Sequence, residues 1–117
     1  MGIWVKGYIV GSYKTGFDSF TIVTGDNASQ MTIGLADNST EDSGVKTLPL
    51  NIDRAANTSI EAIQNALNLY NHPSNLGKQL LINGDIGEWK NSGFDLSGIT
   101  NLQEAHFEDK IYKKKGV

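Results

Sequence analysis

The residues most suited to contacting a ligand lie in two short segments that mix aromatic rings with lysine. The first segment holds Tyr13, Lys14 and Phe17, and the second holds Trp89, Lys90 and Phe94. Aromatic rings with lysines between them suit stacking on bases or sugar rings, and each stacked base contributes about 1–3 kcal/mol to binding. We therefore predict a ligand-binding surface at these residues, with a single-stranded nucleic acid or an oligosaccharide as the ligand.

No set of residues in the sequence matches a catalytic or metal-binding motif. His72 and His106 are far apart, and neither has the H-E-x-x-H spacing of a zinc site. There is no G-x-S-x-G elbow and no phosphate-binding loop, and the chain has no cysteine. The acidic segment 37–46 lacks the ligand spacing of a calcium loop, so we interpret it as a solvated hairpin tip. We expect no metal, no cofactor and no enzymatic activity.

Composition limits the number of domains and the kind of partner. The chain has 117 residues, of which 38% are hydrophobic, which predicts one domain over residues 1–117. Its net charge is -3 and Arg54 is its one arginine, which weighs against strong, nonspecific nucleic-acid binding. No segment approaches the roughly 18 apolar residues needed to cross a bilayer. Met1-Gly2 leads directly into a strand without a signal peptide, so we expect the natural chain to be longer.

One helix is predicted near the middle of the chain. Thr58 and Glu61 have the spacing of a capping box. Four apolar residues then follow at three- and four-residue spacing, which places them on one helix face: Ile60, Ile63, Leu67 and Tyr70. The opposite face carries Glu61, Gln64, Asn65 and Asn68. The segment Asn71-His72-Pro73 is expected to end the helix after about three turns.

Strands are predicted before the helix by alternation of apolar and polar residues, at 3–12, 20–24, 31–36 and 47–52. The segments 20–24 and 31–36 are either two strands or one strand broken by a bulge. In the first strand, Trp4 and Tyr8 share the face opposite Val5 and Ile9. We interpret Trp4 and Tyr8 as an outer patch, of the kind that a neighbouring domain covers.

Two further strands are predicted after the helix. The first spans 77–86, where we interpret Asn83-Gly84 as a kink, although this pair is also a strong hairpin signal. Residues 88–91 are expected to form a loop. The last strand is expected to begin at 93–95 or slightly later, with 99–107 as its best candidate. The basic segment from about residue 110 to 117 is interpreted as a flexible, solvated tail.

Three strands, one helix and two strands in this order predict an all-β fold with one helix: a five-stranded OB-fold Greek-key β-barrel, with the helix between strands three and four. OB folds bind ligands with the loops between strands one and two and between strands four and five. Tyr13, Lys14 and Phe17 belong to the first of these loops. Trp89, Lys90 and Phe94 belong to the second.

The aromatic residues of these loops also have a structural interpretation. Small barrels need large side chains to close their ends, and Phe17 or Phe94 would serve there as well as in a ligand site. We assign Phe20 to the core, whereas Trp89 lies in a polar segment and is expected to be exposed. Three acidic residues lie among the lysines and would reduce a positive potential: Asp18, Glu88 and Asp95.

Three segments in order resemble a family of uncharacterised OB-fold domains found in bacterial secreted proteins and lipoproteins. They are VKGYIVG at 5–11, Leu35-Ala36-Asp37, and the helix-exit motif NLYNHPSNLGK at 68–78. His72 stands where asparagine is commoner in that family. The resemblance covers most of residues 5–86 and weakens after Gly87. It implies an OB barrel and a cell-envelope or secreted origin, and it implies no reaction.

The function predicted from these observations is a non-catalytic binding or accessory module of a larger protein. The alternative is a structural spacer or protein-interaction domain without a small ligand, whose partners are adjacent domains of the parent chain. A third hypothesis, a hydrolytic enzyme, requires a nucleophile or metal site that the sequence does not offer.

Overall fold

The computed structural model describes residues 2–13, 20–21, 32–41, 46–52, 60–91 and 94–115; at 13, 20–21, 88–91 and 94–97 it describes the backbone. The elements in chain order are β1 (Ile3–Tyr13), β2 (Phe20–Thr21), β3 (Thr32–Ala36), β4 (Leu48–Asn51), α1 (Glu61–Leu67), the 3-10 helix η5 (Pro73–Asn75), β5 (Gln79–Asn91), β6 (Phe94–His106) and β7 (Ile111–Lys113). The fold is mostly antiparallel β-sheet with one α-helix, as the sequence predicts.

Strand β1 holds the sheet together because it pairs on both sides. Its residues 3–8 pair antiparallel with β5, and its residues 8–11 pair antiparallel with β3. Strand β3 pairs antiparallel with β4, which in turn lies parallel to β6 at Leu50 and Ile99. Strand β6 pairs antiparallel with β5. The pairings therefore lead from β1 through β3, β4, β6 and β5 back to β1.

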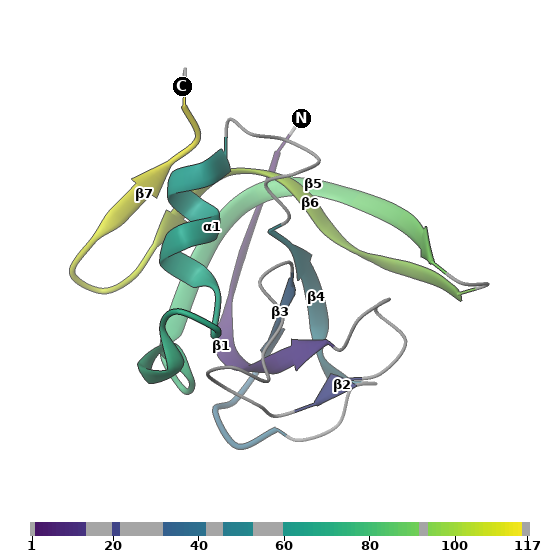
Figure 1. Cartoon of the computed structure of the whole chain (residues 1–117), viewed down its shortest axis with the longest axis horizontal. Helices are drawn as coiled ribbons and strands as arrows, with labels where there is room; N and C mark the ends of the chain where they lie inside the picture. The colour runs from purple at the N-terminus through teal and green to yellow at the C-terminus, as the bar shows by residue number, and fades with distance from the viewer. Residues whose placement is uncertain are drawn as a thin grey trace.

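Two short strands extend this arrangement. β2 pairs with Ser12 and Tyr13 at the end of β1, beyond the residues of β1 that pair with β3. β7 pairs with β6 from Glu104 to His106. It forms within the basic segment for which the sequence predicts a solvated tail. Figure 1 shows β7 next to α1, at the opposite side of the molecule from the far end of the β5–β6 hairpin.

The hydrophobic core combines side chains from the sheet and from the helix region. Its fully or almost fully buried members are Ile9, Ile33, Leu35, Leu50, Ile52, Ile63, Leu67, Leu69, Leu80, Ile82, Ile99, Leu102 and Ala105. In β5, Leu80 and Ile82 alternate with more exposed residues, as expected for a strand with one buried face, whereas all five residues of β3 are buried. The helix contacts β6 and β7, so it covers one part of the core beside the C-terminal strand.

The helix is shorter than the sequence predicts. It spans seven residues, which is about two turns. Ile60 is its N-cap residue and no side chain makes a capping hydrogen bond there, while Thr58 lies outside the described residues. Ile60, Ile63 and Leu67 are buried, as predicted.

The helix also ends earlier than predicted, at Asn68 instead of at Asn71-His72-Pro73. Asn68 has an extended backbone with ψ 140°. Because the helical period stops there, Tyr70 does not join the buried stripe: it is 38% exposed and Leu69 is buried instead. Gln64 and Asn68, predicted on the solvent side, are also buried.

The hairpin of β5 and β6 corrects one prediction and confirms another. β5 runs through Asn83-Gly84 with a register shift between Asn83 and Asp85, so this pair is a kink and not a turn. Residues 88–91, predicted as a loop, continue β5 and pair with 94–97 of β6. The hairpin thus projects beyond the rest of the sheet (Figure 1), and Ile86 on β5 is 74% exposed.

Candidate functional site

The six residues predicted to bind a ligand are only partly within the described structure. Lys14 and Phe17 lie outside it. Tyr13 ends β1, where it pairs with Phe20 of β2. Trp89, Lys90 and Phe94 belong to the projecting hairpin instead of a loop. Their role in binding stays a prediction.

The register of the hairpin divides the three residues of the second segment. Position 89 pairs with 96, position 90 with 95, and position 91 with 94. Consecutive strand positions belong to opposite faces, and paired positions share a face. Positions 89 and 94 therefore belong to one face of the hairpin and position 90 to the other. A loop would not impose this separation.

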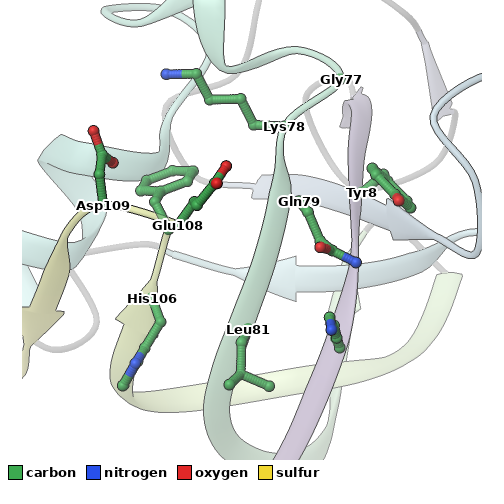
Figure 2. A pocket seen from close by; sticks show the side chains of 10 residues that line it. Tyr8, Gly77, Lys78, Gln79, Leu81, His106, Glu108 and Asp109 are labelled. Atoms are coloured by element: carbon green, nitrogen blue, oxygen red, sulfur yellow. The ribbon is translucent and has the colours of Figure 1, made fainter.

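The described residues form a groove elsewhere, on the outer face of β1, β5 and β6. It has a volume of about 990 Å³ and is lined by Lys6 and Tyr8 of β1, residues 77–79, Leu81 of β5, and residues 106–109. We call this the outer groove. Figure 2 shows Gln79 and Tyr8 on one side of it, Glu108 and Asp109 on the other, and Lys78 along the rim between them.

Strand alternation explains why these side chains face outward. In β1, Lys6 and Tyr8 alternate with the buried Gly7 and Ile9. In β5, Gln79 and Leu81 alternate in the same way with the buried Leu80 and Ile82. Tyr8 pairs with Gln79, Lys6 with Leu81, and Leu81 with His106. These pairs place residues from three strands side by side on one surface.

His106 lines the outer groove at the end that is lowest in Figure 2. Its Nε2 lies 2.7 Å from Oε2 of Glu104 on the same strand. Its ring meets the ring of Trp4 edge-on, with centroids 5.5 Å apart. Trp4 is 54% exposed. It extends the surface of the outer groove along β1, on the face that it shares with Lys6 and Tyr8.

The turn between β6 and β7 forms the wall opposite β1. The N–H of Phe107 donates to the carbonyl of Lys110 at 2.8 Å. The ring of Phe107 meets that of Tyr112 edge-on at 6.3 Å, and Nζ of Lys78 lies 5.6 Å from the Phe107 centroid. These contacts connect Phe107 to β7 and to Lys78. Glu108 and Asp109 follow Phe107 in the same turn and are exposed.

The helix-exit motif at 68–78 has a structural role. The side-chain N–H of Asn68 donates to the carbonyl of Gln64, and its Oδ1 accepts from the N–H of Asn71, both at 2.8 Å. The side-chain N–H of Asn75 donates to the carbonyl of Ala66 at 2.8 Å. These buried amides add side-chain bonds to backbone groups at the end of the helix, where the regular helical pairing stops.

The end of the same motif positions part of the outer groove. Gly77 has φ +88°, a conformation that glycine adopts readily. Its N–H donates to the carbonyl of Ile9 at 2.7 Å, and the N–H of Ile9 donates to the carbonyl of Lys78 at 2.9 Å. The motif therefore brings Lys78 and Gln79 beside Tyr8 and contributes to the site through its backbone.

Within the described residues, no group of three or more His, Cys, Asp or Glu side chains could hold a metal ion. In the same part of the chain, no helix is long and apolar enough to cross a membrane. Among the described residues that line the outer groove there is no serine, threonine or cysteine, and the phenol of Tyr8 is their one hydroxyl group.

The family model described as "Domain of unknown function (DUF6359)" matches residues 1–108. The chain belongs to this family. The expectation of an uncharacterised domain family is thus confirmed. Comparison with curated proteins and with solved structures finds no match.

Sequence reasoning on this DUF6359 domain missed most of the outer groove. Gly77 and Lys78 end the helix-exit motif and Gln79 follows it, while residues 106–109 comprise the last residue of β6 and the turn after it. One signal was present: alternation in β1 places Trp4 and Tyr8 on a common outer face. What the sequence alone does not provide is the pairing of β5 with both β1 and β6, which brings the other residues to that face.

Proposed function

We propose that this DUF6359 domain is a non-catalytic binding module with the five-stranded OB architecture, and that its ligand occupies the outer groove. The circuit of pairings through β1, β3, β4, β6 and β5 supports the architecture, because it matches a small closed barrel in which one pair of strands is parallel. In this interpretation β2 and β7 are additions to the barrel. The helix then lies between barrel strands three and four.

The outer groove is the observation that carries the binding function. Binding sites for organic ligands are concave, with an apolar floor and a few converging polar groups. The outer groove has Leu81 and Phe107 as apolar residues and Gln79, Glu108 and Asp109 as polar ones. Half of its lining residues lie on paired strands, which hold a ligand-binding arrangement more rigidly than loops do.

Two features favour binding without catalysis. Hydrolysis of a glycosidic bond by the usual route needs two carboxyl groups on opposite sides of that bond. Glu108 and Asp109 are consecutive, exposed residues of one turn. The carboxylate of Glu104 is already paired with His106.

We include a cell-envelope or secreted location in the proposal, on the strength of the motifs that resemble domains of that origin.

The test uses the two tryptophans of the chain, Trp4 and Trp89. In the Trp89→Phe variant the fluorescence comes from Trp4 and reports on the outer groove. In the Trp4→Phe variant it comes from Trp89 and reports on the hairpin. Each variant is titrated with oligo-dT and with a panel of neutral oligosaccharides, at low and at physiological salt.

We expect a saturable change in the Trp89→Phe variant and no change in the Trp4→Phe variant. A response from Trp89 only would place the site on the hairpin and overturn the proposal for the outer groove. No response from either variant would overturn the binding function and favour a structural spacer.

A further inference from the structure

We infer that the ligand of the outer groove is a neutral oligosaccharide of more than one sugar unit. This inference rests on the proposed function, since it names the chemical class that the same groove binds. It uses four properties of the described residues: the balance of charge, the mixture of hydrogen-bond donors and acceptors, the apolar surface, and the position of Trp4.

The charges that line the outer groove oppose a ligand of either sign. Lys6 and Lys78 are matched by Glu108 and Asp109. Nucleic-acid phosphates are bound by clustered lysine and arginine, but here two carboxylates line the same groove as the two lysines and offset their charge. A cationic ligand would meet the two lysines in the same way. An uncharged ligand avoids both repulsions.

The hydrogen-bonding groups suit hydroxyls. A hydroxyl donates one hydrogen bond and accepts others. Among the lining residues, Lys6 and Lys78 donate hydrogen bonds, Glu108 and Asp109 accept them, and the amide of Gln79 and the phenol of Tyr8 do both. Figure 2 shows Gln79 on one side of the groove, Glu108 and Asp109 on the other, and Lys78 between them. A ligand carrying several hydroxyls can satisfy them together, whereas an apolar ligand would leave them without partners.

The apolar surface suits the carbon face of a sugar ring. Leu81 lies in the floor between Lys6 and His106 in the pairing register, and Tyr8 lies on the same face of β1. Aromatic side chains with one polar end suit sites where part of the ligand is apolar and part is hydrated. Tyr8 and Leu81 therefore provide a surface for C–H groups, with the polar side chains around it.

Trp4 indicates that the ligand extends beyond one ring. It lies four residues from Tyr8 on the same face of β1, which is about 13 Å along a strand. It is 54% exposed and is oriented by its edge-on contact with His106, a residue of the outer groove. A second sugar unit can stack on Trp4 while the first occupies the groove.

The class is tested by isothermal titration calorimetry of the wild-type domain with four probes: cellotetraose and chitotetraose, which are neutral, and tetragalacturonate and oligo-dT, which are anionic. We expect at least one neutral tetrasaccharide to bind with an affinity that changes little as salt is raised. Tighter, salt-sensitive binding of an anionic probe in the outer groove would overturn the class while leaving the binding function intact. Binding of none of the probes, together with silence of both tryptophan variants, would overturn both.

The contribution of Trp4 is tested by comparing the bound neutral tetrasaccharide with its monosaccharide. We expect Trp4→Ala to weaken tetrasaccharide binding roughly tenfold, in line with the loss of one stacking contact. Monosaccharide binding should stay unchanged. Ile86→Ala is the matched control, because it removes an exposed apolar side chain from β5 outside the groove. Equal losses for both ligands, or a loss in the control, would contradict the role given to Trp4.

The role of the acidic wall is tested with the double variant Glu108→Gln, Asp109→Asn. Both residues are exposed, so the variant is expected to fold. It should bind the neutral tetrasaccharide several-fold more weakly and gain affinity for oligo-dT, because the repulsion of phosphate is removed. Unchanged affinity for both probes would contradict the argument from charge.

Discussion

The imidazole of His106 meets the indole of Trp4 edge-on, with ring centroids 5.5 Å apart and an angle of 82° between the planes. Trp4 belongs to β1 and His106 to β6, and β5 lies between them, paired with both. The contact therefore crosses a whole strand on the outer face of the sheet. It connects an exposed aromatic ring to a residue that lines the outer groove.

Removing this contact should release Trp4. In a Trp89→Phe background, we expect His106→Ala to lower the fluorescence anisotropy of Trp4, because the indole loses its neighbouring ring. The free energy of unfolding should fall by about 0.5–1.5 kcal/mol, the usual contribution of an aromatic pair. The control is His72→Ala, at an exposed position outside the groove. Unchanged anisotropy in His106→Ala would show that His106 does not orient Trp4.

Asn68 should be the most sensitive polar residue of the helix-exit motif. Asn68→Ala removes two side-chain bonds, one to the N–H of Asn71 and one to the carbonyl of Gln64, which keeps its bond from the backbone N–H of residue 68. We expect a loss of about 1–3 kcal/mol in the free energy of unfolding, measured with urea. Asn65→Ala, at an exposed position of the same helix, should change it by less than about 0.5 kcal/mol. Similar losses of stability in the Asn68→Ala and Asn65→Ala variants would contradict the structural role that we give to the motif.

Gly77 should resist substitution because of its backbone alone. Its φ is +88°, and no heavy atom lies within 4 Å of the place where a Cβ would be. Gly77→Ala is therefore expected to cost about 1–2 kcal/mol from conformation and nothing from crowding. Gly77→Asn should cost less, because asparagine tolerates positive φ better than alanine does. Thermal unfolding of the two variants decides this, and a larger loss for asparagine would contradict it.

Gly84 should resist substitution for a different reason. A Cβ there would lie 2.7 Å from Cγ2 of Ile99 and 3.0 Å from Cδ2 of Leu102. We expect Gly84→Ala to destabilise the fold by about 1–3 kcal/mol through overpacking. In an Ile99→Ala background, where Cγ2 is absent, the added cost should be smaller. Additive losses in urea unfolding would indicate that the clash with Ile99 is not the cause.

The sequence predicts local features of the fold well where one physical signal dominates. Alternation assigns the faces of β1 as far as Ile9, which lies in the core while Trp4 lies at the surface; it fails at Val10, which is buried where the pairing register shifts. Three- and four-residue spacing finds the buried Ile63 and Leu67 of the helix. Asn83-Gly84 is correctly interpreted as a kink within one strand, although the apolar residues on its two sides differ: Ile82 is buried and Ile86 is exposed.

The predictions fail where distant pairing or side-chain bonding overrides local preference. Residues 88–91 are polar and look like a loop, yet they pair with 94–97. The helix ends at Asn68 because its amide bonds to the backbone, an effect that hydrophobic spacing does not report. The outer groove combines β1 with residues 106–109, about one hundred positions away. That proximity depends on the pairing of β5 with both β1 and β6.

The most direct test of the outer groove is an NMR titration of the ¹⁵N-labelled domain with the neutral tetrasaccharide that calorimetry selects. We predict that the perturbed amides cluster at residues 4–8, 77–81 and 106–109 and saturate with a common affinity. Amides of β3 and of the far end of the hairpin should stay unchanged. Perturbations confined to the hairpin or to β3, with none at 77–81 or 106–109, would contradict the assignment of the outer groove as the binding site.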